Sequence, residues 1–427
     1  MRSSTPTLVS LILLMSMAAA PVLADDAQTH LQKAKVAAAQ QNWDAALTEL
    51  DATIAIDKNN IEAHSGRAMM LVKKQDLQGA ITEIGRVLEI DPKNADAYSV
   101  RSALYQQTGD KAKAKDDYIA FLRLSPAEAD KLQAAAQAAA DKQDWANAAN
   151  LWSLVTEVRP GDAKAHYALG MVLKNSYYTV FMNSSGQPNF QENLDKLKAD
   201  TKASFDAAIK ADPKFAPAYL AQDDPEAIAQ GLKQMPDNAE LLVARAQMSL
   251  TGIPSDDIIK AALSDYDHAI KVDPKNANAF TSRAGAYLWA KKYDLALADT
   301  KRALELKPND YETIVLRGLL YGDLYDYAHQ AAENERALAI KPNDTVTSYN
   351  YFTALTHLPE KARALPIISK LIDGEPASVL YLSSRAQLYF DLKEYGKAAA
   401  DVDKVLTIEA DNKQALDLKT KIAAAQK

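Results

Sequence analysis

The chain has no cysteine, and glycine is scarce, with 14 among 427 residues. The lack of cysteine excludes disulfides and a lipid-modified cysteine. The few glycines leave little material for strained catalytic loops. Basic residues are outnumbered, and the formal net charge of −7 argues against nucleic acid or anionic lipid as the main partner. With 48% hydrophobic and 25% charged residues, the composition is that of an ordered soluble protein.

Catalytic and cofactor-binding patterns are also missing from the sequence. The six histidines occur singly, with no pair at a metal-ligand spacing such as HExxH. GxSxG, SxxK, GxxxxGK and GxGxxG are absent, and no aspartates have EF-hand spacing. We therefore predict a protein that is not an enzyme, with no catalytic residues, no bound cofactor and no metal site.

The N-terminus has the layout of a secretory signal peptide. Arg2 gives a short basic start, residues 8–20 are almost all apolar, and Val22-Leu23-Ala24 offers small residues for cleavage before Asp25. This run is shorter than the roughly twenty residues of a membrane span, and no second long apolar run follows. We expect cleavage after Ala24 and export, most simply to a bacterial periplasm because disulfides are absent. A retained apolar helix or an N-terminal anchor is the alternative.

Nine prolines recur at a nearly constant interval. The separations are 34, 34, 53, 23, 38, 34, 34 and 34 residues. A period near 34 predicts a repeat array in which each unit buries its apolar face against its neighbours. The prolines are Pro92, Pro126, Pro160, Pro213, Pro236, Pro274, Pro308, Pro342 and Pro376.

Each unit has the pattern of two short helices. Over residues 277–308, apolar and small side chains fall at helical spacing up to Lys291 and again from Leu295. Pro308 ends the second helix, and Asn309-Asp310 offers a cap for the next one. A helix of about thirteen residues is marginal alone in water, so stacking must supply its stability.

Small residues recur where helices are expected to cross closely, because a larger side chain there would force the backbones apart. Phe352, Asp223 and Gln330 are exceptions, and their units are expected to pack more loosely. The small residues are Ala80, Ala114, Ala148, Ala262, Ala296 and Ala364 on second helices, and Ser102, Ala136, Gly170, Ala246, Ala284, Gly318 and Ala386 on first helices.

Opposite charges also repeat, sixteen residues apart, one on each helix of a unit. Where the basic member is lost, at Ala135 and Tyr351, the acidic member is lost too, at Leu151 and Ile367. We infer ion pairs that fix the register of the two helices and, as exposed pairs, contribute only ~0–1 kcal/mol each. The alternative is a ladder of arginines that binds an acidic ligand. The pairs are Arg67/Glu83, Arg101/Asp117, Arg283/Asp299, Arg317/Glu333, Arg385/Asp401, Lys33/Glu49 and, with four extra residues, Arg245/Asp265.

The prolines, small residues and charge pairs recur at the same positions of each unit. This pattern resembles the tetratricopeptide repeat, a helix–turn–helix unit. The resemblance implies an all-α solenoid, a right-handed superhelix of about ten or eleven units from Ala27 to about Ala410. The expected segments are a signal peptide (1–24), an N-terminal array (25–173), an irregular insertion with a shortened repeat (174–238), a C-terminal array (239–412) and a capping helix (413–427).

The period breaks after Leu173, where residues 174–199 exceed a regular unit by some nineteen residues. Residues 184–188 have the Ser-, Gly- and Pro-containing composition that is typical of a loop. The next unit is eleven residues shorter than a regular one. One interpretation is a loop whose aromatic residues cover the shortened unit. The other is an arm, residues 174–200, that binds or dimerises. Residues 174–255 are the expected hinge, and the aromatic residues concerned are Tyr177, Tyr178, Phe181 and Phe190.

In the family that the chain resembles, first helices line a concave face. This resemblance implies a protein-binding groove, and Trp289, at the edge of its helix, is the favoured anchor. The front half implies a more polar groove: Glu62, Ser65, Met69, Lys73, Asp96, Ser99, Gln106 and Gln107. The groove residues of the C-terminal half are Asn278, Thr281, Trp289, Val315, Leu319, Tyr349, Thr353, His357, Gln387 and Phe390.

The expected function is that of a scaffold that binds a peptide segment or a helix of an envelope protein in this groove. Nucleic acid and an integral membrane span are not expected. The alternative is a structural protein that self-associates through residues 174–200.

Overall fold

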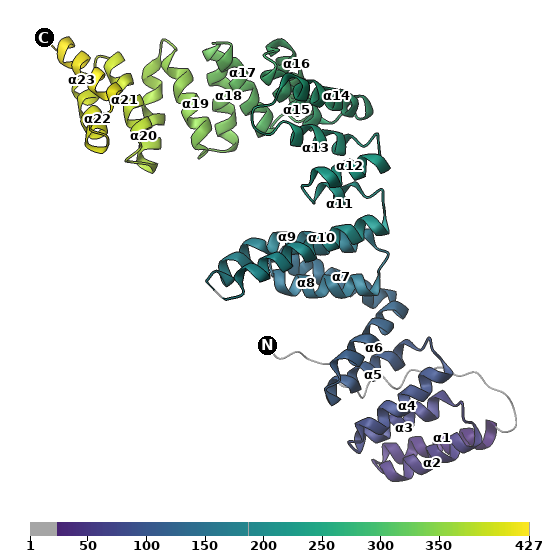
Figure 1. Cartoon of the computed structure of the whole chain (residues 1–427). Helices are drawn as coiled ribbons and strands as arrows, with labels where there is room; N and C mark the ends of the chain where they lie inside the picture. The colour runs from purple at the N-terminus through teal and green to yellow at the C-terminus, as the bar shows by residue number, and fades with distance from the viewer. Residues whose placement is uncertain (1–23, 187, 427) are drawn as a thin grey trace. The chain divides into compact units, whose positions relative to one another are not determined.

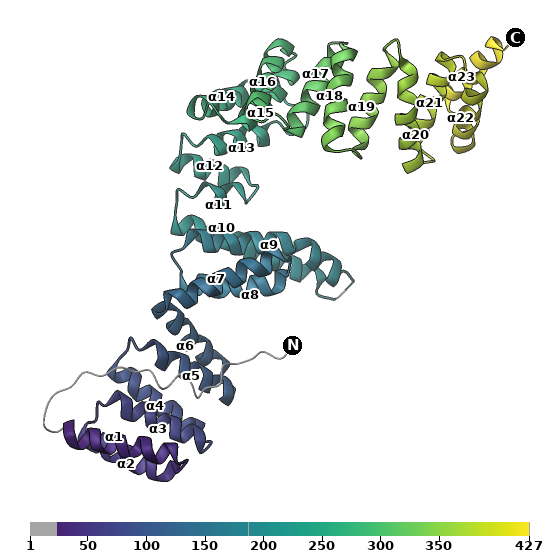
Figure 2. The same cartoon turned by 180° about the vertical axis from the view of Figure 1, so that it is seen from behind.

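The computed structural model describes residues 24–186 and 188–426, and within these ranges every regular element is a helix. The described residues form two compact units, which divide between Ala221 and Gln222 (Figures 1 and 2). The division lies within residues 174–255, the expected hinge. The predicted signal peptide, apart from Ala24, lies outside the described residues. Among those described, no helix combines the length and apolar character needed to cross a bilayer.

Unit 1 consists of helical hairpins that stack in chain order. Its helices are α1 (Ala24–Ala39), α2 (Trp43–Ile56), α3 (Ile61–Lys73), α4 (Leu77–Ile90), α5 (Ala95–Thr108), α6 (Lys111–Leu124), α7 (Pro126–Asp141), α8 (Trp145–Val158), α9 (Ala163–Ser184), α10 (Phe190–Ala211) and α11 (Ala216–Leu220).

Unit 2 continues with the same kind of hairpin and also stacks in chain order. Its helices are α12 (Pro225–Gln234), α13 (Ala239–Ser249), α14 (Asp256–Val272), α15 (Ala277–Trp289), α16 (Tyr293–Leu306), α17 (Tyr311–Asp323), α18 (Tyr327–Ile340), α19 (Thr345–Thr356), the 3₁₀ turn η1 (Lys361–Ala364), α20 (Leu365–Gly374), α21 (Val379–Asp391), α22 (Tyr395–Ile408) and α23 (Lys413–Ala425).

The turn inside each regular hairpin has a fixed form. Its first helix closes with a residue in the left-handed region, and the second helix begins shortly after it. Asp76, for example, accepts a hydrogen bond from the backbone N–H of Gly79 at 2.8 Å. The left-handed residues are Gln41, Gln75, Gly109, Gln143, Lys291, Tyr325 and Lys393.

The predicted helix crossings are confirmed, because the small residues assigned to them are buried. Ala284 on α15 and Ala296 on α16 are inaccessible to solvent and belong to one core cluster with Leu320. Gly318 on α17 lies so close to α18 that an added Cβ would stand 3.1 Å from Asn334 Oδ1. Close backbone approach therefore depends on these small side chains.

The predicted inter-helix ion pairs form, and their carboxylates are more buried than expected. Arg101 donates from Nε and Nη2 to Asp117, at 2.7 and 2.8 Å. Glu49 differs from the prediction, because it lies 2.5 Å from His30 Nδ1. The other pairs have N–O distances of 2.6–2.7 Å: Arg67/Glu83, Arg245/Asp265, Arg283/Asp299, Arg317/Glu333 and Arg385/Asp401.

The structure differs from the expected irregular insertion over 174–200. These residues lengthen α9 and α10 to 22 residues each, so the hairpin extends beyond α7 and α8 in both views (Figures 1 and 2). The physical reason is that Tyr177, Phe181 and Leu194 keep helical spacing on each side of a short turn. The repeat that follows this hairpin is short, since α11 ends at Leu220 and α12 starts at Pro225.

Candidate functional site

Unit 2 contains a groove of about 910 Å³, here called the C-terminal groove. The first helices α19 and α21 and the last helix α23 form its walls, and α22 lies at its base. Its lining residues are Tyr349, Phe352, Thr353, Thr356, His357, Val379, Leu380, Ser383, Ser384, Ala386, Gln387, Leu388, Asp391, Val402, Val405, Asn412, Gln414, Ala415, Asp417 and Leu418.

Hydroxyl, amide and carboxylate groups dominate the rim of the C-terminal groove. The hydroxyls of Tyr349 and Ser384 lie 3.0 Å apart and tie α19 to α21. Gln387 donates to Asp391 at 2.8 Å, along α21. Tyr381 packs beside Tyr349 with the two rings tilted and their centres 5.7 Å apart, and burial raises the pKa of Tyr381. The groove therefore offers hydrogen bonds over an apolar base, as sites for extended peptides do.

His357 is held in place at one edge of this groove. Its ring stacks on Tyr327 with centres 4.0 Å apart, and its Nδ1 donates to the carbonyl of Thr353 at 2.9 Å. The contact with Tyr327 joins α18 to the end of α19. A fixed, exposed ring of this kind suits contact with a partner and requires little loss of side-chain entropy.

The C-terminal groove brings together four of the ten residues predicted for binding: Tyr349, Thr353, His357 and Gln387. The other six lie outside its lining. Asn278, Leu319 and Trp289 are exposed, and Trp289 retains 51% of its surface at the end of α15.

The remaining three predicted residues make structural contacts. Thr281 hydrogen-bonds to Thr313 at 2.5 Å, Val315 packs beside a core cluster, and Phe390 packs on Tyr395 with ring centres 5.6 Å apart. The sequence pattern predicted these residues from helix register alone, whereas the contacts that they make depend on the neighbouring repeat.

Unit 1 contains a second, more apolar cavity of about 540 Å³, here called the N-terminal slot. It lies between α1 and α3 above α2 and includes four residues predicted for the front groove: Glu62, Ser65, Met69 and Lys73. Asp96, Ser99 and Gln107 do not line it. The other lining residues are Leu31, Ala34, Lys35, Ala38, Ala39, Trp43, Ala46, Leu50, Gly66 and Met70.

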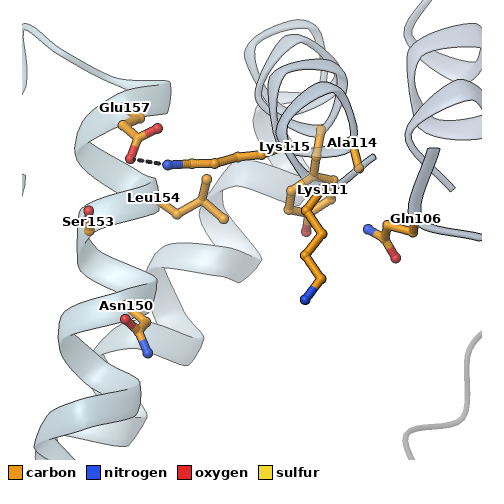
Figure 3. A pocket seen from close by; sticks show the side chains of 9 residues that line it. Gln106, Lys111, Ala114, Lys115, Asn150, Ser153, Leu154 and Glu157 are labelled. Carbon is orange, nitrogen blue, oxygen red and sulfur yellow. Dashed lines mark hydrogen bonds and ion pairs between the residues drawn. The ribbon is translucent and has the colours of Figure 1, made fainter. Parts of the chain in front are cut away.

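Gln106, also predicted for the front groove, lines a separate pocket of about 630 Å³ with residues of α6 and α8. Figure 3 shows Lys115 reaching across this pocket to Glu157, at 2.8 Å, while Lys111 points into the open space. A single residue, Ser125, separates α6 from α7, so this junction lacks the longer link of other repeats. The sequence analysis did not predict this pocket.

The aromatic residues of the α9–α10 hairpin do not form a cover over the shortened repeat. Tyr178 is 70% exposed, and Phe181 and Phe190 contact each other near the tip, with ring centres 5.3 Å apart. Tyr177 lies beside Lys198 of α10, whose Nζ is 5.7 Å from the ring centre. These side chains stabilise the hairpin and leave part of its apolar surface exposed.

The histidines of the described residues have separate structural partners. His64 is buried and lies 2.7 Å from Glu83, and His268 lies 2.8 Å from Asp237. His166 donates to the carbonyl of Pro160 at 3.0 Å. In the part of the chain that the structure describes, no three His, Asp or Glu side chains are arranged to hold a metal ion.

Stacked two-helix hairpins of this length define an α-helical repeat protein. A family model described as "Tetratricopeptide repeat" matches residues 31–95 and 259–311, and a second model with the same description matches residues 95–128. Residues 31–128 and 259–311 therefore match the tetratricopeptide repeat that the sequence pattern predicted. A comparison with curated proteins gave no match.

Solved structures of similar proteins include YrrB, described as a TPR protein with an unusual peptide-binding site. It is 19% identical with a TM-score of 0.42, over 46% of this chain and 100% of YrrB. Yeast Tom70 is 14% identical with a TM-score of 0.37, over 94% of this chain and 95% of Tom70. The TPR domain of P58(IPK) is 17% identical with a TM-score of 0.24, over 94% of this chain and 98% of the P58(IPK) domain.

Proposed function

We propose that this protein is a non-catalytic scaffold that binds an extended peptide segment or a helix of a partner protein in the C-terminal groove. The observation that carries the proposal is that groove, where Tyr349, Thr353, His357 and Gln387 meet over an apolar base. Backbone groups of an extended segment would pair with its hydroxyls and amides. We expect micromolar affinity, about −8 kcal/mol.

We further propose that the chain is exported and works in the bacterial periplasm on an envelope protein. The basic start, apolar run and small residues of 1–24 support export, and the absence of cysteine agrees with it. A fusion of residues 1–30 to a reporter enzyme active only outside the cytoplasm tests this proposal. Reporter activity that remains after Leu13→Arg, which places a charge within the apolar run, would count against it.

Site-specific photocrosslinking in the native cell tests the groove. A photoreactive phenylalanine at Gln387 should crosslink to one protein, whereas the same residue at Thr407, on the outer side of α22, should not. Ser383→Arg should abolish the crosslink, because it places a bulky charged side chain in the groove. Thr407→Arg is the matched control, since Thr407 is exposed and does not line the groove. Equal crosslinking from both positions would contradict the proposal.

A second candidate function is self-association through the α9–α10 hairpin. The observation that favours it is the exposed apolar surface of Tyr178, Phe181 and Met182 near the hairpin tip. Light scattering on the purified chain and on a Tyr178→Ser/Met182→Ser variant tests it. A dimer that the substitutions dissociate would support self-association, and a monomeric parent chain would exclude it at the concentrations used.

A further inference from the structure

Two neighbouring positions on α1 that line the N-terminal slot carry small side chains, Ala38 and Ala39. Ala38 stands eight residues before the crossing residue Ala46 of the second helix. The residues eight positions before Ala296 and Ala398 are Leu288 and Phe390, whereas Ala148 is preceded at the same distance by Ala140. Each of these large side chains packs beside the core of its own repeat. At Ala38 and Ala39 no long side chain extends from α1 into the space between α1 and α3, and the slot occupies this space.

The walls of the slot are large and apolar. Trp43 and Met69 are partly buried there, while Met70, Leu31 and Leu50 are almost inaccessible. Unbranched methionine side chains adapt to differently shaped apolar groups. The volume of about 540 Å³ falls within the usual range for ligand sites. The slot therefore has the shape and polarity to receive a bulky apolar side chain.

The rim of the slot carries one charge that forms no ion pair among the described residues. Lys35 on α1 pairs with Glu62 on α3 at 2.7 Å, so these two charges cancel across the opening. Lys73, at the end of α3, lines the slot and forms no ion pair within the described part of the chain. Its neighbour Lys74 is already paired with Asp44. The remaining charge is positive and favours a carboxylate.

We propose that the N-terminal slot is a second docking site, for a short peptide segment of a partner protein in which a bulky apolar side chain is followed within one to three residues by Asp or Glu. The apolar side chain enters between Trp43 and Met69, and the carboxylate pairs with Lys73. This site lies in unit 1, whereas the C-terminal groove lies in unit 2, where the lining residues Asp391 and Asp417 are paired with Lys361 and Lys421.

A fluorescence-anisotropy titration of the purified chain tests the docking site. The probe is a labelled, end-blocked hexapeptide of sequence GLFEEG, and GLFKKG and GAAEEG serve as comparison peptides. We expect saturable binding of GLFEEG at micromolar to submillimolar concentration. GLFKKG and GAAEEG should each bind at least five-fold more weakly, because one lacks the carboxylates and the other the bulky side chains.

Two substitutions test the slot itself. Ala38→Leu fills it and should weaken GLFEEG binding at least ten-fold; leucine at the equivalent Leu288 shows that the fold accepts this side chain. Lys73→Glu should weaken the binding of GLFEEG at least five-fold and strengthen the binding of GLFKKG. Lys93→Glu makes the same charge change in the exposed α4–α5 loop and should have no effect. Circular dichroism and melting temperature establish that each variant is folded.

Several results would overturn the proposal. These are no saturable binding of GLFEEG, equal binding of GLFEEG and GLFKKG, or GLFEEG binding that Ala38→Leu leaves unchanged. A dimer in sedimentation velocity that Ala38→Leu dissociates would also overturn it, because a second copy of the chain would then occupy the slot. Ser383→Arg, in the other groove, should leave GLFEEG binding intact, which separates this proposal from the proposed function.

Discussion

Arg283 on α15 binds Asp299 on α16 through two parallel hydrogen bonds, Nε to Oδ2 and Nη2 to Oδ1, each 2.7 Å long. The third nitrogen, Nη1, donates to Asp267 on α14 at 2.6 Å. One guanidinium group therefore joins three consecutive helices across two repeats. Asp267 and Asp299 stand sixteen residues before and after Arg283. The pair thus sets the spacing between repeats as well as the register within one.

The same geometry recurs in other repeats. Arg385 on α21 binds Asp401 on α22 with bonds of 2.7 and 2.8 Å, and its Nη1 donates to Ser369 on α20 at 3.2 Å. Bidentate arginine–carboxylate pairs are geometrically selective. The side chain of Asp299 is only 8% exposed, so its charge depends on the arginine for compensation.

We predict that Arg283→Met lowers the free energy of unfolding by about 3–5 kcal/mol, because it leaves the carboxylate of Asp299 buried without a partner. Asp299→Leu added to Arg283→Met should recover most of the loss, since both charges are then removed. Urea unfolding followed by circular dichroism measures both effects. Arg302→Met is the control: Arg302 forms an exposed pair with Glu305, so the expected change is within about 0.5 kcal/mol. Equal losses for Arg283→Met and Arg302→Met would contradict the prediction.

The sequence predicted that Arg283 pairs with Asp299, but neither the contact of Arg283 with Asp267 nor the burial of Asp299. The spacing of sixteen residues recurs from repeat to repeat, and the acidic member is absent where the basic one is, so Arg283 and Asp299 could be paired from sequence alone. The burial of Asp299 depends on how closely α14, α15 and α16 approach, which the small residues permit but do not measure. Similarly, register identifies the groove positions Tyr349 and Gln387, whereas the contacts that remove Thr281 and Phe390 from the groove come from neighbouring helices.

The structure of the 174–200 segment and the presence of the N-terminal slot could not be predicted from the sequence. The aromatic residues of this segment have no equivalent in the regular repeats. Such extra residues are typical of an inserted loop, because the helices of the family pattern all have the regular length. The helices α9 and α10 lengthen together, and this outcome depends on mutual packing that a single-helix pattern does not reveal. In the slot, Ala38 gives no sequence signal because alanine is common throughout the chain.

A second prediction concerns Gln330 and Gly322. Gln330 on α18 is buried, stands where other repeats have alanine, and has no hydrogen-bond partner for its Oε1. Its Nε2 would lie 2.7 Å from a Cβ placed on Gly322 of α17. Gly322→Leu alone should therefore destabilise the protein by about 1–3 kcal/mol through overpacking. Gln330→Ala alone should also destabilise it, because it leaves a cavity.

The double variant Gly322→Leu/Gln330→Ala recreates the combination of Leu288 and Ala296 in the preceding repeat. It should equal or exceed the parent chain in stability, because it also removes a buried unpaired amide and a helical glycine. The expected favourable coupling is about 1–3 kcal/mol in a double-mutant cycle of urea midpoints. Additive losses in the double variant would show that the two side chains do not share one space.

The left-handed residues of the hairpin turns give a third prediction. Gln75 has φ 66°, and Gly109 occupies the same place one repeat later with φ 84°. Gln75→Gly should raise stability by about 0.5–1 kcal/mol, because a side chain is strained in this region. Gly109→Ala should lower it by a similar amount; its Cβ would have no atom within 4 Å, so the backbone alone is tested. Thermal melts measure the stability of both variants. If both substitutions raised the melting temperature, or both lowered it, this explanation would be wrong.

The capping carboxylate of Asp344 gives a pH-dependent prediction. It accepts a hydrogen bond from the backbone N–H of Thr347 at 2.7 Å, and this bond, with the Thr347 side chain, holds the pKa of Asp344 below its ordinary value of 3.8. Since the folded state binds this proton less tightly than the unfolded chain, Asp344 stabilises the fold above about pH 4. That contribution is lost as the pH falls through the folded pKa.

Asp344→Asn keeps a capping oxygen but cannot titrate, so it isolates this effect. At pH 7 the parent chain should melt at a higher temperature than the variant, and the difference should shrink steadily between about pH 5 and pH 2. Melting curves of both proteins across this pH range measure the convergence. Asp411→Asn, at an exposed place in the loop before α23, is the control and should show no such convergence. A constant difference for Asp344→Asn across the series would mean that the charge of Asp344 adds nothing to the capping bond.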